Sequence, residues 1–432
     1  MSIHLKIEQL SDVTKQQIDE DTNLNYTHVI KRSGKQIFKT YHFHSITDEH
    51  CIIPFSYCLT NYPSCRKKRS EYYPFTTEAT KCIAIPRPEQ REIIKESISQ
   101  LKSTGSTMIS AYPGFGKTCC SIILACKIKL RVLVIVNKVL LMTQWKDSIT
   151  AFSPDASICC LTPAIIKKKK NIPECDFYIV NAINIPKLDK KFLHTVGNVI
   201  VDEAHLIMAE SLSRSLHCLQ PRNLIGLTAT PYRPDGLDTL LTLYFGSHRI
   251  IRKLAREHIV YTVNTGFKPI VKFTNDGTMN WGSVLDSQAS DTGRNKIITD
   301  IVANHPDRNI LIMVKRVSQG EYLNKTLIHN NERVDTLLGK SQTFDKDARV
   351  LIGTTQKVGT GFDHNRLDML ILAADVDEYF IQYLGRIFRT KEGIPIVFDL
   401  VDDNYTLQKH FKSRCSVYTE HGGTIRQYNP PS

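Results

Sequence analysis

The sequence predicts an α/β protein with two parallel-sheet domains in tandem, preceded by a small N-terminal domain that is β-rich or α+β. The chain has 432 residues, which is too long for one ordinary hydrophobic core. Its hydrophobic content of 41% and charged content of 23% are those of a folded protein. From about residue 81 onward, short β-branched runs alternate with longer amphipathic stretches, the pattern of parallel strands joined by crossover helices.

The expected strands fall into two groups. We expect strands at 107–110, 131–136, 177–180, 198–201 and 223–227 in the first group, and at 309–314, 350–352, 369–372 and 395–398 in the second. Near the N-terminus, "KQIFKTYHFHSI" and "CIIPFSYCL" are typical of strands, and "NYPSCRKKRSEYYPF" is typical of a polar loop.

These runs divide the chain into four expected segments. They are a small N-terminal domain at 1–80 that would bind nucleic acid or a partner, a first α/β domain at 81–250, a connecting segment or insertion at 251–292, and a second α/β domain at 293–432. Within the third segment, "NDGTMNWGSVLDSQASDTG" is rich in Gly, Ser, Asn and Asp with little periodicity, which indicates a linker or exposed insertion.

Charge and cysteine content restrict the partners and the compartment. The formal net charge of +13 favours a polyanion such as nucleic acid. The 12 cysteines include two adjacent pairs and no CxxC pair, so we expect free thiols in a reducing compartment. No apolar run is long enough to cross a bilayer, and the N-terminus lacks an apolar signal region. We therefore expect a soluble protein of the cytoplasm or nucleus without a membrane partner.

The stretch "AYPGFGKTCC", residues 111–120, predicts a phosphate-binding loop. Between the strand end at Ala111 and the expected helix start at Lys117, Gly114 and Gly116 let the backbone curl with its N–H groups inward. Lys117 can reach the β and γ phosphates, and the Thr118 hydroxyl can hold Mg²⁺. Ala111 stands where the general pattern has glycine, and the alternative is an ordinary strand-to-helix turn.

The stretch "NVIVDEAHL" supplies the acids that such a loop needs. Asp202 and Glu203 directly follow an apolar run, at the strand end where parallel sheets place their ligands. Asp202 would complete the Mg²⁺ shell, and Glu203 would polarise the attacking water. The alternative is an exposed acidic turn.

These motifs and several others, in this order, resemble the DEAH-box helicases and translocases of superfamily 2. In the first half the resemblance rests on the phosphate loop, on "DEAH" at 202–205, on Thr228 and Thr230 of "TAT", on Gln90 of "RPEQ", and on "VLVIVNKVLLMTQW" at 132–145. The family usually has proline near Asn137, so that detail departs from the pattern.

The second half carries the remaining family motifs. They are "ILIMVKRVSQGEYL" at 310–323, "VLIGTTQKVGTGFD" at 350–363 with Thr355, Gly361 and Asp363, and the element Gln382-x-x-Gly385-Arg386-x-x-Arg389. The last element resembles the arginine-finger motif, although "GRIFR" alone would suit a helix with a solvated basic face. Only ten residues separate Gly339 from Val350, where relatives usually have a helix, so the second domain is expected to be trimmed.

The resemblance implies two RecA-like domains that bind ATP and Mg²⁺ and move along one nucleic-acid strand, 3′ to 5′. It implies that Lys117, Glu203, Arg386 and Arg389 carry hydrolysis and that Gln90 contacts adenine. Around the nucleotide it implies contacts from Ala111, Gly114, Gly116, Thr118, Asp202, Gly361 and Asp363, with Thr118 and Asp202 on the metal. It assigns coupling or nucleic-acid contact to Thr228, Thr230, Thr355 and Gln382.

The stretch "TATPYRPDG" and the closing "HFKSRCSVYTEHGG" resemble the DEAH translocases of nucleotide-excision repair, recombination and transcript release. This resemblance favours DNA over RNA as the track, and a monomer that meets transcription or repair machinery. Poxviruses and other large DNA viruses have similar small members that release transcripts, which would place the protein in a virus factory or virion. The alternatives are an RNA helicase, the motor subunit of a nuclease complex, a P-loop kinase or GTPase, and a non-hydrolysing nucleic-acid-binding module.

Overall fold

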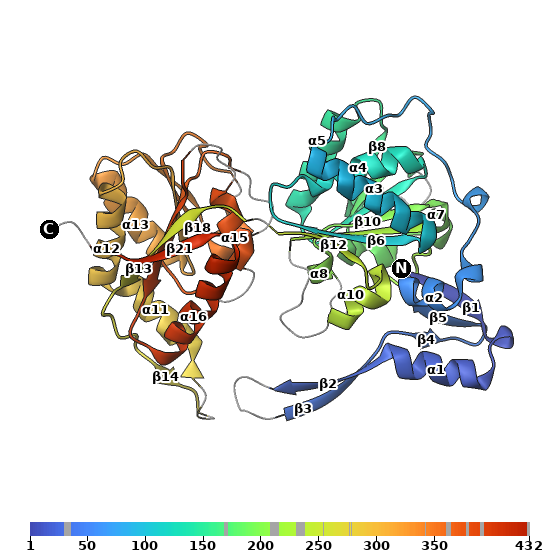
Figure 1. Cartoon of the computed structure of the whole chain (residues 1–432), viewed down its shortest axis with the longest axis horizontal. Coiled ribbons are helices and arrows are strands. Elements are labelled where there is room, and N and C mark those ends of the chain that lie inside the picture. Colours follow the sequence, from blue (N-terminus) through green and yellow to red (C-terminus); the bar gives the residue numbers. More distant parts are fainter. Residues whose placement is uncertain are drawn as a thin grey trace. The chain divides into compact units, whose positions relative to one another are not determined.

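Two compact units make up the chain, and each contains a parallel sheet with helices packed on it (Figure 1). The computed structural model describes residues 1–29, 36–167, 172–207, 216–229, 238–253, 255–275, 277, 279–341, 343–359, 364–376, 380–388 and 393–429. The first unit contains residues 1–29, 36–111 and 115–252, and the second contains residues 112–114 and 253–432. The predicted fold class, two α/β domains in tandem, is confirmed.

The first unit has a seven-stranded sheet in which every described pairing is parallel. From edge to edge the strands are β12 (Arg249–Arg252), β6 (Ser106–Ala111), β11 (Asn223–Thr228), β10 (Asn198–Val201), β7 (Val132–Val136), β9 (Phe177–Asn181) and β8 (Ile158–Leu161). All five strands expected here are present. The short edge strands β8 and β12 were not predicted, because four residues give too little periodicity to identify a strand.

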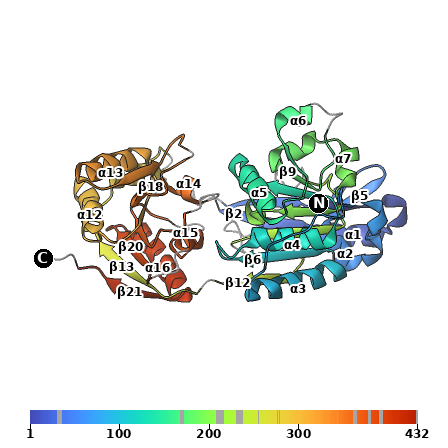
Figure 2. The same ribbon diagram turned by 90° about the horizontal axis from the view of Figure 1, so that it is seen from above.

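Helices connect these strands, as crossover connections in a parallel sheet require. They are α3 (Pro88–Ser103), α4 (Lys117–Ile128), α5 (Val139–Phe152), α6 (Pro163–Lys167), α7 (Lys190–Thr195), α8 (Ala204–Ile207) and α10 (Asp238–Phe245), with a 3-10 turn at Ala182–Lys187. The helices α3 and α4 lie side by side (Figure 2), and α3 also contacts β6. Strand β10 is completely buried, so the sheet lies at the centre of the core.

The second unit repeats this architecture with another seven-stranded parallel sheet. Its order is β17 (Val334–Leu337), β18 (Val350–Thr354), β16 (Ile310–Val314), β19 (Met369–Leu372), β20 (Ile396–Val401), β13 (His258–Asn264) and β21 (Gly423–Gln427). Its helices are α11 (Trp281–Ser290), α12 (Thr292–Ala303), α13 (Val317–His329), α14 (Thr355–Gly359), α15 (Phe380–Ile387) and α16 (Tyr405–Glu420). The four strands expected in this half are present.

The stretch expected to connect the two domains belongs in large part to the second sheet. Strand β13 pairs with both β20 and β21, so 251–292 is not a simple linker. The helix α11 also lies inside the expected linker at 275–293, and a short hairpin of β14 (Lys272–Phe273) and β15 (Met279–Asn280) precedes it. In the sequence of α11, polar residues mask the periodicity of its buried residues, which include Val284, Leu285 and Gln288. The Asn280 side chain caps the first turn of α11 by accepting a hydrogen bond from the Gly282 N–H.

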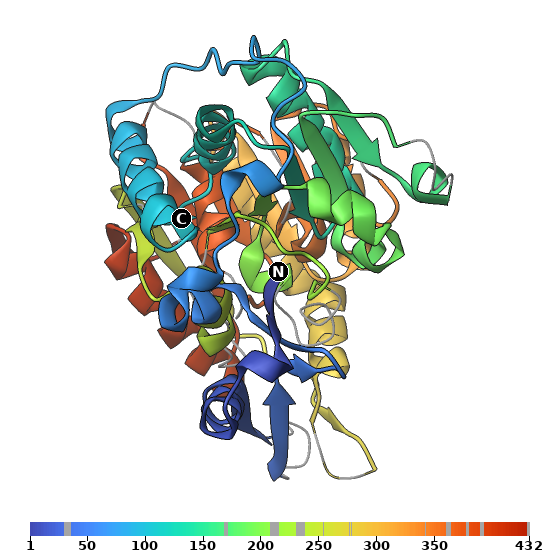
Figure 3. The same cartoon turned by 90° about the vertical axis from the view of Figure 1, so that its right-hand side faces the viewer.

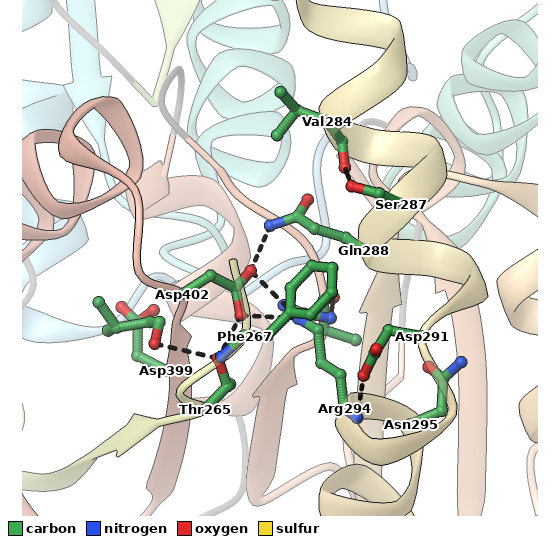
Figure 4. Close-up of polar contacts among 12 residues, drawn as sticks. Thr265, Phe267, Val284, Ser287, Gln288, Asp291, Arg294, Asn295, Asp399 and Asp402 are labelled. Carbon is green, nitrogen blue, oxygen red and sulfur yellow. Dashed lines mark hydrogen bonds and ion pairs between the residues drawn. The ribbon is translucent and has the colours of Figure 1, made fainter. Parts of the chain in front are cut away.

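A buried ion pair ties α12 to the loop after β20 in the second unit (Figure 4). Arg294 Nε donates to Asp402 Oδ1 at 2.9 Å, and both side chains are fully excluded from solvent. Asp402 also accepts from Gln288 Nε2 at 2.5 Å and from the Thr265 hydroxyl at 2.6 Å. Arg294 Nη1 donates to the Ala373 carbonyl after β19. The Asp402 carboxylate therefore holds three other segments of the unit, and Arg294 links them to the end of β19.

The N-terminal region has the expected β-rich character. It contains a sheet of β1 (Ser2–Lys6), β5 (His50–Pro54) and β4 (Ser45–Ile46), a hairpin of β2 (Asn23–Val29) and β3 (Gln36–His42), and the helices α1 (Asp12–Thr22) and α2 (Phe55–Asn61). Short 3-10 turns occur at Ile7–Gln9, Pro63–Cys65 and Arg69–Glu71. The stretch "CIIPFSYCL" is therefore a strand only to Pro54, and the expectation of a strand beyond it is wrong.

This region shares a hydrophobic core with the first unit and also has a small cluster of its own, formed by Leu5, Ile18, Cys51, Ile53 and Cys58. Met1 and Phe55 belong to the same buried cluster as Leu219 and Phe245. The Ser2 N–H donates to the Leu219 carbonyl at 2.8 Å, and the N-terminal strand lies against the first unit (Figure 3). The helix α2 packs against α10. Residues 1–29 and 36–61 are thus an extension of the first unit.

Two further expectations concern bilayers and thiols. Across the described ranges, no helix combines the length and apolarity that a bilayer crossing requires. All 12 cysteines lie in described parts of the chain and are free thiols.

Candidate nucleotide site

The candidate site lies at the carboxyl ends of three strands of the first sheet. The phosphate loop follows β6, the Asp202-Glu203 pair follows β10, and Thr228 is the last residue of β11, which lies between them in the sheet. Because parallel strands all end at the same edge, residues that are about a hundred positions apart in sequence are brought together.

The loop has the backbone conformation that its glycines predicted. Gly114 has φ 84° and Gly116 has φ 91°, a left-handed conformation that a side chain rarely tolerates. Helix α4 begins at Lys117, as predicted, so the N–H groups of its first turn are available to an anion. Lys117 Nζ donates to the Ala111 carbonyl at 2.6 Å, which holds the ammonium over the loop. Thr118 follows in the same turn.

Gln90 and Arg87 hold the loop from the start of α3. Gln90 Nε2 donates to the Phe115 carbonyl at 2.8 Å, and its Oε1 accepts from the Arg87 N–H at 2.8 Å. The Arg87 guanidinium donates to the same Phe115 carbonyl. A Cβ on Gly116 would lie 2.5 Å from Gln90 Nε2, so only glycine fits beside this amide. Both polar ends of Gln90 are therefore engaged inside the protein, in an arrangement that supports the loop.

The two acids after β10 are held in a strained turn. Glu203 has φ 48°, a left-handed value that costs a non-glycine residue energy and that is often found at functional sites. The Glu203 N–H donates to Asp202 Oδ1 at 3.0 Å. Trp145 Nε1–H, from α5, donates to Asp202 Oδ2 at 2.8 Å. Each oxygen of the Asp202 carboxylate is thus held by one donor.

The Asp202 carboxyl has a perturbed proton affinity. Desolvation and the nearby negative charge of Glu203 raise its pKa from 3.8 to about 6. The hydrogen bond from Trp145, the charge of Lys117 and the Glu203 N–H act in the opposite direction. An anion held in such surroundings is suited to binding a cation, because the cation would relieve the electrostatic cost.

His205 connects the acidic turn to β11. Its Nδ1 lies 2.7 Å from the Thr228 hydroxyl and 3.5 Å from Glu203 Oε2, and the ring is buried. The acidic turn and the strand that ends in Thr228 are therefore joined, next to the strand that leads into the phosphate loop.

Among the second unit's expected site residues, Thr355 begins α14 and Arg386 lies near the end of α15. Tyr383 of α15 donates its hydroxyl to the Thr355 carbonyl at 3.2 Å, which links these two motifs within the unit. Gln382 lies on α15, but its side chain is outside the described parts. Thr230, Gly361, Asp363 and Arg389 also lie outside the described residues.

The donor atoms at the edge of the first sheet fit a nucleoside triphosphate with magnesium. A carboxylate from Asp202 and a hydroxyl from Thr118 are the oxygen ligands that Mg²⁺ prefers, and Mg²⁺ usually takes only one or two protein ligands beside phosphates and water. Lys117 and the first-turn N–H groups of α4 would meet the phosphates.

Sequence reasoning missed three side chains of this site. Trp145 was too isolated in sequence to interpret, Arg87 was seen only as part of a motif, and no role was assigned to His205. The apolar stretch "LLMTQW" indicated that Trp145 is buried. It could not indicate the hydrogen bond from Trp145 to Asp202, because the two residues are 57 positions apart in sequence.

Comparisons with known proteins agree with this geometry. The family model for "Type III restriction enzyme, res subunit" matches residues 83–233. The chain is 46% identical over 376 residues to "Putative helicase 161L" of Invertebrate iridescent virus 6, covering 82% of this chain and 85% of that protein. It is 35% identical over 348 residues to "Putative helicase 055L" of Frog virus 3 (isolate Goorha), covering 79% of each.

Among solved structures, S. cerevisiae Dbp5 bound to RNA and ADP BeF3 matches with a TM-score of 0.56 at 13% identity, over 78% of this chain and 89% of that chain. This identity is so low that the match shows the fold alone, which is the RecA-like pair.

The phosphate loop and the relatives define the class, a superfamily 2 helicase, and this class implies the use of ATP with a divalent metal. The chain belongs to the superfamily 2 helicases of large DNA viruses.

Proposed function

We propose that the protein is an ATP-dependent DNA translocase or helicase that moves 3′ to 5′ along one strand as a monomer and serves transcript release, repair or recombination. The observation that carries the motor part of the proposal is the convergence of the phosphate loop, Asp202 and Glu203 at one edge of the first sheet. A second α/β unit with its own arginine motif supports a motor over a kinase or GTPase switch, which would need one such domain.

DNA is the proposed track for two reasons. The "TATPYRPDG" and "HFKSRCSVYTEHGG" stretches resemble those of DEAH translocases that act on DNA, and the matching family model describes a restriction-enzyme subunit. The net charge of +13 supports binding to either polynucleotide without choosing between them.

In the proposed site, ATP would supply the γ phosphoryl group, and Mg²⁺ would neutralise part of the phosphate charge. Lys117 would contact the β and γ phosphates, with the loop at Ala111, Gly114 and Gly116 around them. Thr118 and Asp202 would hold the metal. Glu203 would orient the attacking water and accept its proton.

The remaining proposed roles follow the family resemblance. Arg386 and Arg389 would neutralise charge on the γ phosphate, and Gly361 and Asp363 would contact the nucleotide. Thr228, Thr230, Thr355 and Gln382 would couple hydrolysis to strand movement. Gln90 would contact adenine, and because its amide already supports the loop, the base and the loop would share this residue.

Strand displacement tests polarity and track together. Full-length protein is mixed with duplexes that carry a 3′ or a 5′ single-stranded tail, in all-DNA, all-RNA and hybrid form, with ATP and Mg²⁺. We expect displacement of DNA from 3′-tailed substrates and none by Glu203→Gln, which would bind ATP without turning it over. Displacement confined to RNA would overturn the choice of DNA, and displacement from 5′ tails alone would overturn the polarity.

A further inference from the structure

We propose that Trp145 is a positioning residue for the magnesium site, and that its indole N–H fixes the orientation of the Asp202 carboxylate. This inference rests on the proposed function, because it gives Asp202 its role on the metal. Trp145 itself would touch neither the nucleotide nor the metal.

The hydrogen-bond geometry around Asp202 carries the proposal. Trp145 Nε1 lies 2.8 Å from Asp202 Oδ2, and the Glu203 backbone N lies 3.0 Å from Oδ1. Two donors on opposite oxygens stop the carboxylate from rotating. A carboxylate has about four acceptor positions, so each oxygen can still serve a cation or its water. The pattern matches metal sites in which a neighbouring donor orients the ligand and raises metal affinity.

The helix that carries the indole is firmly packed. Trp145 is only 2% exposed, and Leu141, Met142 and Ile149 on the same helix are also buried. The helix α5 contacts β7, β8 and β9. The indole therefore has little freedom of its own, and it can hold Asp202 in one orientation at small entropic cost.

A purely structural role makes a different prediction from a positioning role. If the indole only fills volume, Trp145→Phe would keep an aromatic ring in place and would lower stability without changing how Mg²⁺ acts. If the N–H orients Asp202, the same substitution removes one donor from the carboxylate and weakens the metal site specifically. The two roles separate in the Mg²⁺ dependence of nucleotide binding, which needs neither turnover nor nucleic acid.

The first experiment measures binding of a fluorescent ADP analogue to the full-length protein as Mg²⁺ is raised. We expect Trp145→Phe to raise the half-saturating Mg²⁺ concentration about tenfold or more, with the affinity for nucleotide restored at saturating Mg²⁺. Trp281→Phe is the matched control, since it removes the other of the 2 tryptophans and lies in the second unit. An unchanged half-saturating concentration in a folded Trp145→Phe protein overturns the inference.

The second experiment keeps the inference testable even where Trp145→Phe fails to fold. In the Trp281→Phe protein, Trp145 is the only indole, and we expect its emission to change on addition of Mg²⁺ with ADP, with the half-saturation seen in the binding experiment. If the fluorescence of Trp145 does not change with Mg²⁺ although ADP binding depends on Mg²⁺, the positioning role is overturned and the proposed function still stands. Nucleotide binding that does not depend on Mg²⁺ contradicts both.

Discussion

At the scale of single residues, the site concentrates negative charge and strain in the turn after β10. Glu203 adopts φ 48°, and the pKa of Asp202 is raised to about 6 by desolvation and by Glu203. The protein keeps these unfavourable features at a place where a cation and phosphates would stabilise them. Activity and stability are therefore expected to oppose each other at Asp202.

Asp202→Asn is expected to stabilise the ligand-free protein at neutral pH while abolishing turnover. Above pH 6 Asp202 is ionised in both the folded and the unfolded protein. Because the folded protein stabilises the ionised carboxylate less well than water does in the unfolded chain, ionisation lowers the free energy of unfolding. The shift from 3.8 to about 6 corresponds to roughly 3 kcal/mol at most. As the pH falls from 6 towards 3.8, Asp202 becomes protonated in the folded protein while it is still ionised in the unfolded chain, so the advantage of the variant declines across this window and disappears below it.

The measurement is the free energy of unfolding of both proteins from pH 4 to 8 without nucleotide or Mg²⁺. The difference between them should be small at pH 4, should grow between pH 4 and 6 in favour of the variant, and should stay nearly constant above pH 6. A variant that is less stable than the parent at pH 8 would show that Asp202 is not held at an electrostatic cost.

At the scale of elements, hydrophobic runs were sufficient to predict the buried strands and insufficient at the sheet edges. Strand β10, with four buried residues, was predicted with its observed bounds, 198–201. Strand β13 was missed although its β-branched residues and its alternation are typical of a strand, because the polar stretch that follows led 251–292 to be interpreted as a connecting segment. Helix α11 was missed because its buried positions include Ser287 and Gln288, which a pattern of apolar residues cannot reveal.

Helix α11 also supports the buried ion pair of Arg294 and Asp402, because Gln288 donates a hydrogen bond to Asp402. Loss of this ion pair should lower the free energy of unfolding. Asp402→Asn leaves the Arg294 guanidinium charged, buried and without its anion, so we expect a loss of about 3–5 kcal/mol. Urea unfolding is followed by the tryptophan fluorescence of Trp281, which lies in the second unit, in a Trp145→Phe background, because Trp145 in the first unit would otherwise contribute to the emission.

A matched control removes an exposed ion pair from α12, the helix that carries Arg294. Lys296 and Asp300 are 2.6 Å apart, but their side chains are 72% and 52% exposed. We expect Asp300→Asn to change stability by no more than about 0.5 kcal/mol. Equal effects of Asp300→Asn and Asp402→Asn would contradict the importance of the buried pair.

At the scale of the whole molecule, the chain carries the parts of the proposed site on two separate units. Sequence motifs in the expected order were enough to predict both units, because each motif follows a strand that parallel sheets bring to one edge. They could not predict that residues 1–29 and 36–61 share a core with the first unit, since the contacts of Met1 and Ser2 with 216–219 span more than 200 positions.

If both units act on one nucleotide, a change in the second should stop turnover while binding to the first persists. We expect Arg386→Ala to lower ATP turnover at least a hundredfold, since a neutralising arginine can contribute about 10³–10⁵, with little change in affinity for ADP and Mg²⁺. Arg426→Ala, an exposed arginine on β21 of the same unit, is the control and should behave as the parent. Turnover by Arg386→Ala equal to that of the control would remove Arg386 from the proposed mechanism.

The most direct test of the motor hypothesis is steady-state ATP hydrolysis by the purified full-length protein with and without nucleic acid. We predict that single-stranded, duplex or forked DNA stimulates turnover at least tenfold, that RNA stimulates it less, and that Glu203→Gln shows no stimulated turnover. ATP hydrolysis that no form of DNA or RNA increases would contradict the account.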